Sequence, residues 1–253
     1  MEVGQAVDLL ADDCLVAFPT ETVWGLAARA DSASAMERLR AFKGRDADKP
    51  VAVLVDGPDR LAELGVRLAP AAKRLAERFW PGPLTLVARC SEGRFAPGVA
   101  APDGSIGLRC SSHPLAASLA AGALDRGLGP VTATSLNASG EPPARNAEEA
   151  ARVASRDPSV VLIAGEAGGG AASSVVDATG GPIAVLREGA ICEASILAAA
   201  SPEAAASRAA DPQTLDSSAA GARATQSRAA KPQAAKPQAA NPQALVDPEN
   251  PHR

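Results

Sequence analysis

The stretch FPTETVWG at residues 18–25 decides how the fold is interpreted, because it marks the point where an apolar strand ends. It overlaps the apolar run CLVAFP at residues 14–19, which is typical of a buried strand. Two hydroxyls and a carboxylate then follow at Thr20, Glu21 and Thr22. Ligands collect at the strand ends of open α/β sheets, so this cluster indicates a polar pocket. A plain turn, with Thr20 as its cap, is the alternative.

The charge balance argues against a protein whose main task is to hold a nucleic-acid backbone. Residues 1–193 carry 19 basic and 24 acidic side chains, a net charge of −5, whereas such proteins usually show a basic excess. Hydrophobic residues form 46% of the 253-residue chain, which is enough for a sizeable core. The acidic N-terminal segment does not resemble a signal peptide, and no apolar run approaches the roughly 18 residues of a membrane span. We therefore expect a cytoplasmic protein that does not enter a membrane.

The four cysteines, Cys14, Cys90, Cys110 and Cys192, lie far apart and form no C-x-x-C pair. We expect them to be buried, reduced thiols that act as small hydrophobic side chains. Neither the cysteines nor the two histidines show the spacing of a metal site. The sequence therefore predicts no metal ligands among the protein side chains.

Short apolar runs alternate with helical patterns throughout residues 1–193. The patterns predict helices at 3–13, 32–45, 69–80, 114–124 and 147–155. They predict strands at 14–19, 51–55, 84–90, 105–110, 131–135, 160–165, 173–179 and 183–188, with the last two as an antiparallel pair. This alternation predicts an α/β fold of mixed, α+β-like character, in which helices flank one twisted, open, mixed sheet.

The composition changes near residue 194, where we place the end of a catalytic domain at 1–193. Residues 194–253 are rich in Ala, Pro and Gln, and AAKPQ occurs twice in succession from residue 229. A proline every five residues blocks a helix, and few large apolar groups are present to offset the chain entropy. The sequence therefore predicts a disordered, low-complexity tail.

The segment KGRDADKP at 43–50 gathers three cations. Lys43 continues the apolar stripe of the helix expected at 32–45, so its ammonium is expected to face inward, toward a counter-charge or a bound anion. Arg45 and Lys49 follow in the loop, and the guanidinium offers a two-pronged donor for phosphate or carboxylate. A solvated basic loop, balanced by its own aspartates, is the alternative.

The strand expected at 105–110 places Ser105, Gly107 and Arg109 on one face. A glycine between two polar side chains leaves room for a ligand against the strand. An inward-facing arginine is costly unless it is paired. Arg109 is therefore expected to meet either an anionic ligand or an internal carboxylate.

Hydroxyl, amide and guanidinium groups stand beside three further strands, at Ser135, Asn137, Arg145, Ser173 and Arg187. The glycine-rich segment at 165–177 lacks the G-K-[ST] ending of a Walker A loop, although glycines with flanking hydroxyls suit phosphate oxygens. His113 precedes Pro114 at a helix start, where we expect it to cap the helix. The polar groups are thus hydroxyls and cations without an evident base or nucleophile. Such groups fit transfer at a phosphate, run by positioning and charge neutralisation.

Taken in order, seven segments resemble the YrdC-like family of threonylcarbamoyl-AMP synthases: FPTETVWGLAARAD, KGRDADKPVAVLV, FWPGPLTLVARC, SIGLRCSSHPLA, TSLNASGEPPARN, SSVVDAT and LREG. The resemblance covers about residues 5–190. It implies a twisted mixed sheet with helices around a deep, positively charged cleft. It also implies a nucleotidyltransferase that makes L-threonylcarbamoyladenylate and pyrophosphate from L-threonine, bicarbonate and ATP, with Mg²⁺ on the ATP. Partner proteins would then transfer the threonylcarbamoyl group to adenosine 37 of tRNA.

The resemblance also implies roles for individual positions. The catalytic residues would be Lys43, Arg45, Ser135 and Asn137. The contacts to threonine would come from Thr22, Arg109, Ser135 and Ser173. The contacts to the nucleotide would come from Arg45, Lys49, Ser105, Asn137, Arg145 and Arg187.

The sequence departs from the family pattern at several points. Trp24 stands where tyrosine or phenylalanine is usual, which is expected to alter the shape of the pocket. Leu54 stands where longer relatives carry a histidine near threonine, so that contact is not carried over. The run SSVVD replaces a more usual ESTVVD-like run, and the tail does not resemble the folded second domain of longer members.

Two other functions stay open at this point. The first is an RNA-binding module of the same fold, in which a concave basic cleft holds RNA although residues 1–193 carry net negative charge. The second is a carbamoyl or acyl adenylation enzyme of another pathway, such as hydrogenase maturation. The chain carries no appended acylphosphatase or zinc-finger segment, which makes the second function the less expected one.

Overall fold

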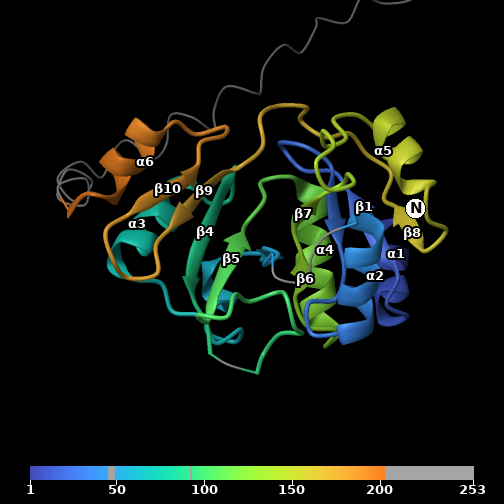
Figure 1. The fold of residues 1–253 in the computed structure, drawn as a ribbon, viewed down its shortest axis with the longest axis horizontal. Coiled ribbons are helices and arrows are strands. Elements are labelled where there is room, and N and C mark those ends of the chain that lie inside the picture. Colours follow the sequence, from blue (N-terminus) through green and yellow to red (C-terminus); the bar gives the residue numbers. More distant parts are fainter. Residues whose placement is uncertain (45–48, 92, 203–253) are drawn as a thin grey trace, which may run out of the picture. The chain divides into compact units, whose positions relative to one another are not determined.

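The computed structural model describes residues 1–44, 49–91 and 93–202, all of which belong to the unit Met1–Ala210 (Figure 1). Arg45 and the part of the predicted tail beyond residue 202 lie outside the described residues. Within the described part, no helix combines the length and the apolar character that crossing a bilayer requires.

The strands of the described part form two open mixed sheets. The first contains β1 (Leu15–Phe18), β2 (Gly25–Ala27), β7 (Thr134–Ser135) and β8 (Val160–Leu162), in the order β7-β2-β1-β8. The second contains β3 (Val53–Leu54), β4 (Leu84–Arg89), β5 (Ser105–Arg109), β6 (Val131–Thr132), β9 (Ser174–Asp177) and β10 (Ala184–Arg187), in the order β10-β9-β4-β5-β3-β6. Strand β1 is parallel to β8 and antiparallel to β2, and β9 and β10 form the expected antiparallel pair. The predicted mixed α/β class is confirmed, with two sheets where one was expected.

The helices of the described part are α1 (Val3–Ala11), α2 (Ala33–Lys43), α3 (Pro70–Phe79), α4 (Pro114–Asp125), α5 (Ala147–Ala154) and α6 (Glu193–Ala200), with a 3₁₀ helix at Pro58–Arg60. The ends of α2 follow from its flanking residues. Ser32 Oγ accepts a hydrogen bond from the Ala35 N–H at 3.2 Å, which caps the N-terminus. Gly44 adopts a left-handed conformation (φ 56°) at the C-terminus, where glycine has no steric penalty.

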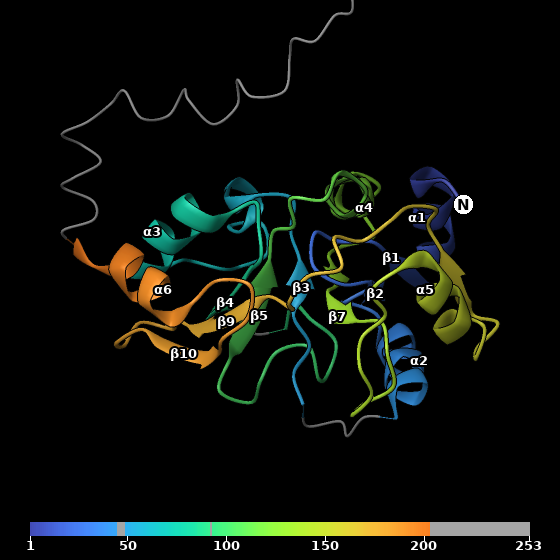
Figure 2. The same cartoon turned by 90° about the horizontal axis from the view of Figure 1, so that it is seen from above.

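Strand β1, inside the four-stranded sheet, is buried on both faces, and its alternate side chains point to opposite sides. Leu15 and Ala17 pack with Met36 of α2. Val16 and Phe18 belong to a different cluster, with apolar side chains of α1 and α4. Figure 2 shows the resulting layers, with α2 on one side of these strands and α1 and α4 on the other.

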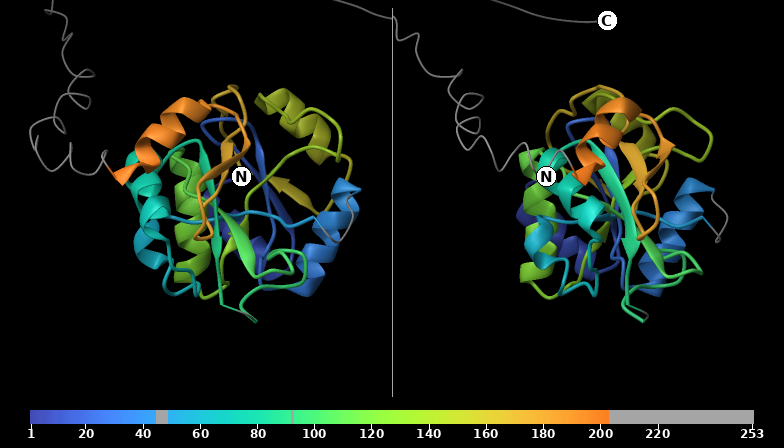
Figure 3. Two further views of the ribbon diagram at one scale, coloured as in Figure 1. Left: turned by 60° about the vertical axis from the view of Figure 1, so that its left-hand side comes forward. Right: turned by 90° about the vertical axis from the view of Figure 1, so that its left-hand side faces the viewer.

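The six-stranded sheet packs its helices against one face and leaves the other for a cavity. Leu84 and Leu86 of β4 pack with α3 and with Ile196 of α6. Figure 3 shows α6 lying beside α3 at this face. The alternate side chains of β4, Thr85 and Val87, point the other way and line the cavity described below.

The stretch expected as one strand at 131–135 is two short strands in different sheets. The N–H of Thr132 donates to the carbonyl of Ala28, directly after β2, at 2.9 Å. The N–H of Ala133 donates to the carbonyl of Ala52, directly before β3, at 2.7 Å. Strand β6 pairs with β3, whereas β7 pairs with β2. The chain therefore passes from one sheet to the other at Ala133.

Three elements were not predicted: β2, α6 and the 3₁₀ helix at Pro58–Arg60. Strand β2 has only three residues, too few to show a period of two. Helix α6 crosses the boundary that we placed at residue 194, and its Ile196 is fully buried. The boundary placed by composition therefore lies inside a helix, because an alanine-rich helix and an alanine-rich tail look alike in composition.

The prediction of buried thiols is confirmed only for Cys110 among the four free cysteines. Burial, together with the nearby carboxylates of Asp56 and Glu21, raises the pKa of the Cys110 thiol to about 11. Cys14 and Cys90 are half-buried, and the prediction is wrong for Cys192, which is exposed at the start of α6.

Candidate functional site

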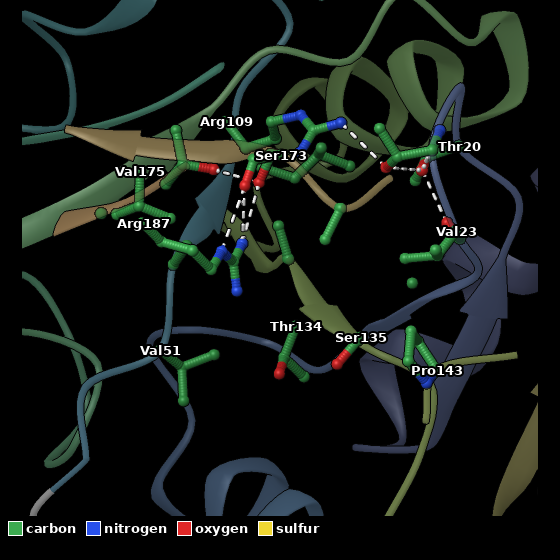
Figure 4. A pocket seen from close by; sticks show the side chains of 18 of the residues that line it. Thr20, Val23, Val51, Arg109, Thr134, Ser135, Pro143, Ser173, Val175 and Arg187 are labelled. Atoms are coloured by element: carbon green, nitrogen blue, oxygen red, sulfur yellow. Dashed lines mark hydrogen bonds between the residues drawn. The ribbon is translucent and has the colours of Figure 1, made fainter. Parts of the chain in front are cut away.

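A cavity of about 720 Å³ lies between residues of the two sheets in the described part of the chain (Figure 4). Strand β7 supplies one wall, and β4, β5 and β9 supply the opposite one. The described lining includes four cationic side chains and no carboxylate; the cations are Lys43, Lys49, Arg109 and Arg187. Cavities of this size hold small ligands, and a concave, cationic lining concentrates anions.

Lys43, Ser135 and Asn137 form a hydrogen-bonded group on the wall beside β7. The Lys43 ammonium, which is buried at the end of α2, donates to the Ser135 carbonyl at 2.5 Å and to Asn137 Oδ1 at 2.7 Å. The Ser135 hydroxyl donates to the same Oδ1 at 2.6 Å, and Asn137 Nδ2 donates to the Glu141 carbonyl at 2.6 Å. The predicted inward direction of Lys43 is confirmed, and the amide of Asn137 is fixed in one orientation.

Strand β5 presents Ser105, Gly107 and Arg109 to the cavity, as its alternation predicts. A Cβ atom at Gly107 would lie 3.1 Å from the Cβ of Ala52. The glycine therefore also allows a close approach of the neighbouring strand segment. Ser105 donates its hydroxyl to Asp103 Oδ1 at 2.7 Å, which fixes the hydroxyl at the edge of the cavity.

An internal carboxylate is the partner of Arg109. Its Nη2 donates to Glu21 Oε1 at 2.8 Å and to Thr22 Oγ1 at 3.2 Å. The Ser111 hydroxyl donates to the second carboxylate oxygen, Glu21 Oε2. Burial opposes the charge of Glu21, but Arg109 and Ser111 outweigh it and hold the pKa of this carboxyl below its usual range.

The two threonines of the opening stretch are both buried and both line the cavity. Thr20 Oγ1 donates to the Val23 carbonyl at 2.6 Å and accepts from the Thr22 N–H at 3.1 Å, which is the expected turn cap. Thr22 Oγ1 receives the guanidinium of Arg109. The turn therefore forms part of the pocket wall: Thr20 caps the turn, and Thr22 contacts Arg109.

Ser173 and Arg187 stand at the β9–β10 end of the cavity (Figure 4). Arg187 donates from Nη2 to the Ser173 carbonyl at 2.8 Å, and Thr85 Oγ1 lies 2.9 Å from Ser173 Oγ. Partial burial, and then the nearby charge of Arg109, lower the pKa of the Arg187 guanidinium. Two like charges facing one space are stabilised by an anion between them.

The structure brings together most of the residues singled out from the sequence. Those that line the cavity are Thr22, Lys43, Lys49, Ser105, Arg109, Ser135, Asn137, Ser173 and Arg187. Arg145 is exposed and lies outside the described lining, and its N–H donates to Glu149 Oε2 at 2.8 Å. Arg45 lies outside the described residues. The roles expected of these side chains stay predictions.

The sequence analysis counted Glu21 in the opening polar cluster but gave it no role of its own, and it gave none to Thr85 or Thr134, which line the cavity. Thr85 and Thr134 looked like ordinary strand residues, and no signal distinguished them. Glu21 did carry a signal. It stands between two candidate threonines, and Arg109 required an anionic partner.

The glycine-rich segment does not line the cavity with its glycines. Among its described residues, the lining comes from Ala172, Ser173 and Val175. Gly168 instead packs against the main chain of Glu21, where a Cβ atom would lie 2.1 Å from the carbonyl oxygen. The glycine at this position therefore has a packing role.

His113 caps α4, as expected. Its Nδ1 accepts a hydrogen bond from the Leu115 N–H at 3.2 Å. Trp24 and Leu54, the two departures from the family pattern, are both fully buried and both line the cavity. The indole N–H of Trp24 has no hydrogen-bond partner among the described residues.

The described side chains do not form a metal site. No group of three His, Cys, Asp or Glu side chains able to hold a metal is present in residues 1–44, 49–91 and 93–202. The described lining also lacks carboxylates, which Mg²⁺ prefers as protein ligands.

Comparison with known proteins shows that the chain is similar to one protein family and to its named members. The sequence model of the family Sua5_yciO_yrdC, described as "Telomere recombination", matches residues 8–189. The threonylcarbamoyl-AMP synthase of Bacillus subtilis is 35% identical over 195 residues, which make up 77% of this chain and 55% of that protein. The threonylcarbamoyl-AMP synthase of Chromohalobacter salexigens is 36% identical over 175 residues, 69% of this chain and 90% of that protein.

A solved structure agrees with the sequence matches. The crystal structure of P. abyssi Sua5 complexed with L-threonine matches with a TM-score of 0.71 and 32% identity, covering 78% of this chain and 56% of that one. The chain spans about half the length of the B. subtilis and P. abyssi relatives. The resemblance seen in the seven motifs is thereby confirmed, and the chain belongs to the Sua5/YciO/YrdC family.

Proposed function

We propose that this chain is an L-threonylcarbamoyladenylate synthase, a nucleotidyltransferase that uses L-threonine, bicarbonate and ATP and releases pyrophosphate. The observation that carries the proposal is the convergence of nine sequence-predicted residues on one cationic cavity. The names of the relatives support it, because proteins 35% and 36% identical to this chain are called threonylcarbamoyl-AMP synthases. The P. abyssi relative supports it further, since its crystal structure holds L-threonine.

The proposed reaction has two steps. The amine of threonine attacks CO₂ derived from bicarbonate, loses a proton and becomes an N-carboxylate. One oxygen of this carboxylate then attacks the α-phosphorus of ATP, and the bond to the β-phosphate oxygen breaks as pyrophosphate leaves. Both reactants of the second step are anions, so positioning and charge neutralisation dominate the catalysis.

In the proposal, the two reactants occupy different parts of the cavity. Arg109, Thr22 and Ser173 would receive the threonine, with the carboxylate of the amino acid on the guanidinium. The nucleotide contacts would come from Lys49, Ser105, Asn137 and Arg187, together with Arg45 and Arg145. Lys43, with Ser135 and Asn137 around it, would offset the charge that develops between the two reactants.

Mg²⁺ would enter bound to the phosphates of ATP, and it would offset part of their charge. The downstream partners would be threonylcarbamoyl transferase proteins, which deliver the group to adenosine 37 of tRNA. Because ATP and tRNA are cytoplasmic substrates, the proposal places the protein in the cytoplasm.

The test is pyrophosphate release by the purified chain, with each substrate omitted in turn. We expect release to require threonine, bicarbonate, ATP and Mg²⁺ together, and the product to have the mass of threonylcarbamoyl-AMP. Release that depends on carbamoyl phosphate in place of threonine and bicarbonate would identify a different adenylation enzyme. Tight RNA binding with a steep salt dependence, and no pyrophosphate release, would identify an RNA-binding module.

A further inference from the structure

Glu21 forms an ion pair with Arg109, which lines the cavity, but Glu21 is not itself among the described lining residues. Its Oε1 accepts from Arg109 Nη2 at 2.8 Å, and the same Nη2 reaches Thr22 Oγ1 at 3.2 Å. The Ser111 hydroxyl holds the other oxygen of Glu21. The carboxylate therefore binds the guanidinium from the side of the protein, and Arg109 keeps its place on the cavity wall.

The pair is withdrawn from water. The side chains are 9% exposed at Arg109 and 18% exposed at Glu21. An arginine at such a position requires a counter-charge, because an uncompensated buried charge is strongly destabilising. The Nε of Arg109 is buried and has no hydrogen-bond partner within the described residues. The Glu21 and Thr22 contacts are thus the ones that fix the orientation of this guanidinium.

A second guanidinium, that of Arg187, lines the same cavity as Arg109. Arg187 is itself close enough to Arg109 for the two charges to interact. Without Glu21, the positive charges of Arg109 and Arg187 would therefore both face this end of the cavity, which would then attract anions such as phosphate.

We propose that Glu21 is a positioning and specificity-determining residue, which orients Arg109 and cancels its charge so that this end of the cavity accepts a zwitterionic amino acid in preference to phosphate. This inference rests on the proposed function, which places threonine on Arg109. A zwitterion has no net charge, so its binding depends on the direction of the guanidinium more than on the total charge nearby. Inorganic phosphate and the phosphates of ATP depend directly on the total charge.

Two substitutions separate orientation from charge. Glu21→Gln keeps the shape and an acceptor oxygen for Arg109 but removes the charge. Glu21→Ala removes both the charge and the acceptor. Glu148→Gln on α5 is the matched control, because Glu148 is exposed, pairs with Arg152 and is not among the described lining residues.

The experiment uses the full chain and follows labelled pyrophosphate released from radiolabelled ATP, with threonine varied at several fixed concentrations of inorganic phosphate. For Glu21→Gln we expect the inhibition constant of phosphate against threonine to fall about tenfold or more, while the KM for threonine changes less than about threefold. For Glu21→Ala we expect the KM for threonine to rise about tenfold, with the KM for ATP unchanged. Glu148→Gln should behave as the wild type in every measurement.

Two results would overturn the inference. The first is a phosphate inhibition constant in Glu21→Gln that equals that of the wild type. The second is an unchanged KM for threonine in Glu21→Ala. If Glu21→Ala fails to fold, as circular dichroism would show, the Glu21→Gln measurement still decides the charge effect.

A calorimetric titration with inorganic phosphate separates this inference from the proposed function. We expect phosphate to bind Glu21→Gln about tenfold more tightly than the wild type, and this gain to vanish in the double variant Glu21→Gln/Arg109→Gln. If the wild type releases no pyrophosphate but the gain appears, the proposed function is wrong and the charge role of Glu21 stands. If the enzyme is active and the gain is absent, the inference about Glu21 is wrong.

Discussion

The ammonium of Lys43 lies 2.7 Å from Oδ1 of Asn137, although 94 positions separate the two residues in the chain. Lys43 ends α2, whereas Asn137 follows β7, so the contact joins two elements of different type on one wall of the cavity. The amide of Asn137 also accepts the Ser135 hydroxyl. The position of the Lys43 charge is therefore fixed before any substrate arrives.

Lys43→Met should abolish most of the activity while keeping the fold. The substitution preserves much of the side-chain volume at the end of α2 but removes the charge that offsets repulsion between the reactants. Loss of one such charged donor costs about 10²–10³ in kcat, and we expect a loss of this size in threonine-dependent pyrophosphate release. Lys73→Met, on the exposed side of α3, is the control and should keep the wild-type rate. A well-folded Lys43→Met variant with full turnover would contradict the proposed mechanism.

Glu21 should give the protein a stability contribution that disappears in acid. Burial opposes its charge, but Arg109 and Ser111 outweigh burial, so the pKa in the folded state lies below the ordinary value of 4.5. A carboxyl group whose pKa is lower in the folded state stabilises the fold at pH values above its unfolded-state pKa. This contribution is lost as the pH falls from the unfolded-state pKa through the folded-state pKa. The difference in unfolding free energy between the wild type and Glu21→Gln should thus be constant near neutral pH and shrink below pH 4.5. Urea unfolding at a series of pH values measures it, and a difference that does not change with pH would refute the assignment.

Gly168 and Gly170 should respond in opposite ways to alanine, although they are two residues apart in the same loop. A Cβ atom at Gly168 would lie 2.1 Å from the Glu21 carbonyl oxygen, a main-chain contact that cannot move away easily. We expect Gly168→Ala to destabilise the protein by about 1–3 kcal/mol, as overpacking does. At Gly170 nothing lies within 4 Å, so Gly170→Ala should be neutral or stabilise by about 0.4–1 kcal/mol. Thermal unfolding compares the two, and equal effects would show that the contact with Glu21 is unimportant.

Ile196 should matter to stability far more than its neighbour Leu197. The first is fully buried between α6 and the α3 side of the six-stranded sheet, whereas the second is 44% exposed. Truncation of a buried isoleucine to alanine removes apolar contacts and leaves a cavity, at a cost of about 2–5 kcal/mol. Leu197→Ala should cost much less. Chemical denaturation of both variants tests whether the folded domain includes α6, and two equally stable variants would mean that it does not.

Much of the site could be predicted because its residues follow simple periods. The alternation of β5 placed Ser105 and Arg109 on one face, and the helical stripe of α2 turned Lys43 inward. These patterns are local, and each is long enough to be recognised in the sequence. The convergence of the separate segments on one cavity came from the resemblance to the family, since no local pattern reports a distance between β5 and α2.

The remainder depended on contacts that a single segment does not reveal. The segment 131–135 was predicted as one continuous strand, because the residues on both sides of Ala133 have similar β propensity. In the structure, it is divided between the two sheets. The boundary placed at residue 194 falls inside α6, because the alanines of α6 resemble those of the tail and only Ile196 distinguishes the helix. The partner of Arg109 was left open between a ligand and a carboxylate, and it is Glu21, 88 positions away.

The exchange of sheets at Ala133 has a consequence for how the chain tolerates insertions. Thr132 belongs to the six-stranded sheet, but its Oγ1 already contacts the four-stranded one, since it accepts from the Ala28 N–H at 2.9 Å and donates to the Leu26 carbonyl of β2 at 3.2 Å. Three residues later, the Ser135 carbonyl accepts from the Lys43 ammonium. Adding or deleting one residue between them would turn the side chains of β7 to the opposite face. Natural length variants of this protein are therefore expected to change at its outer turns and to keep the spacing from Thr132 to Ser135 invariant.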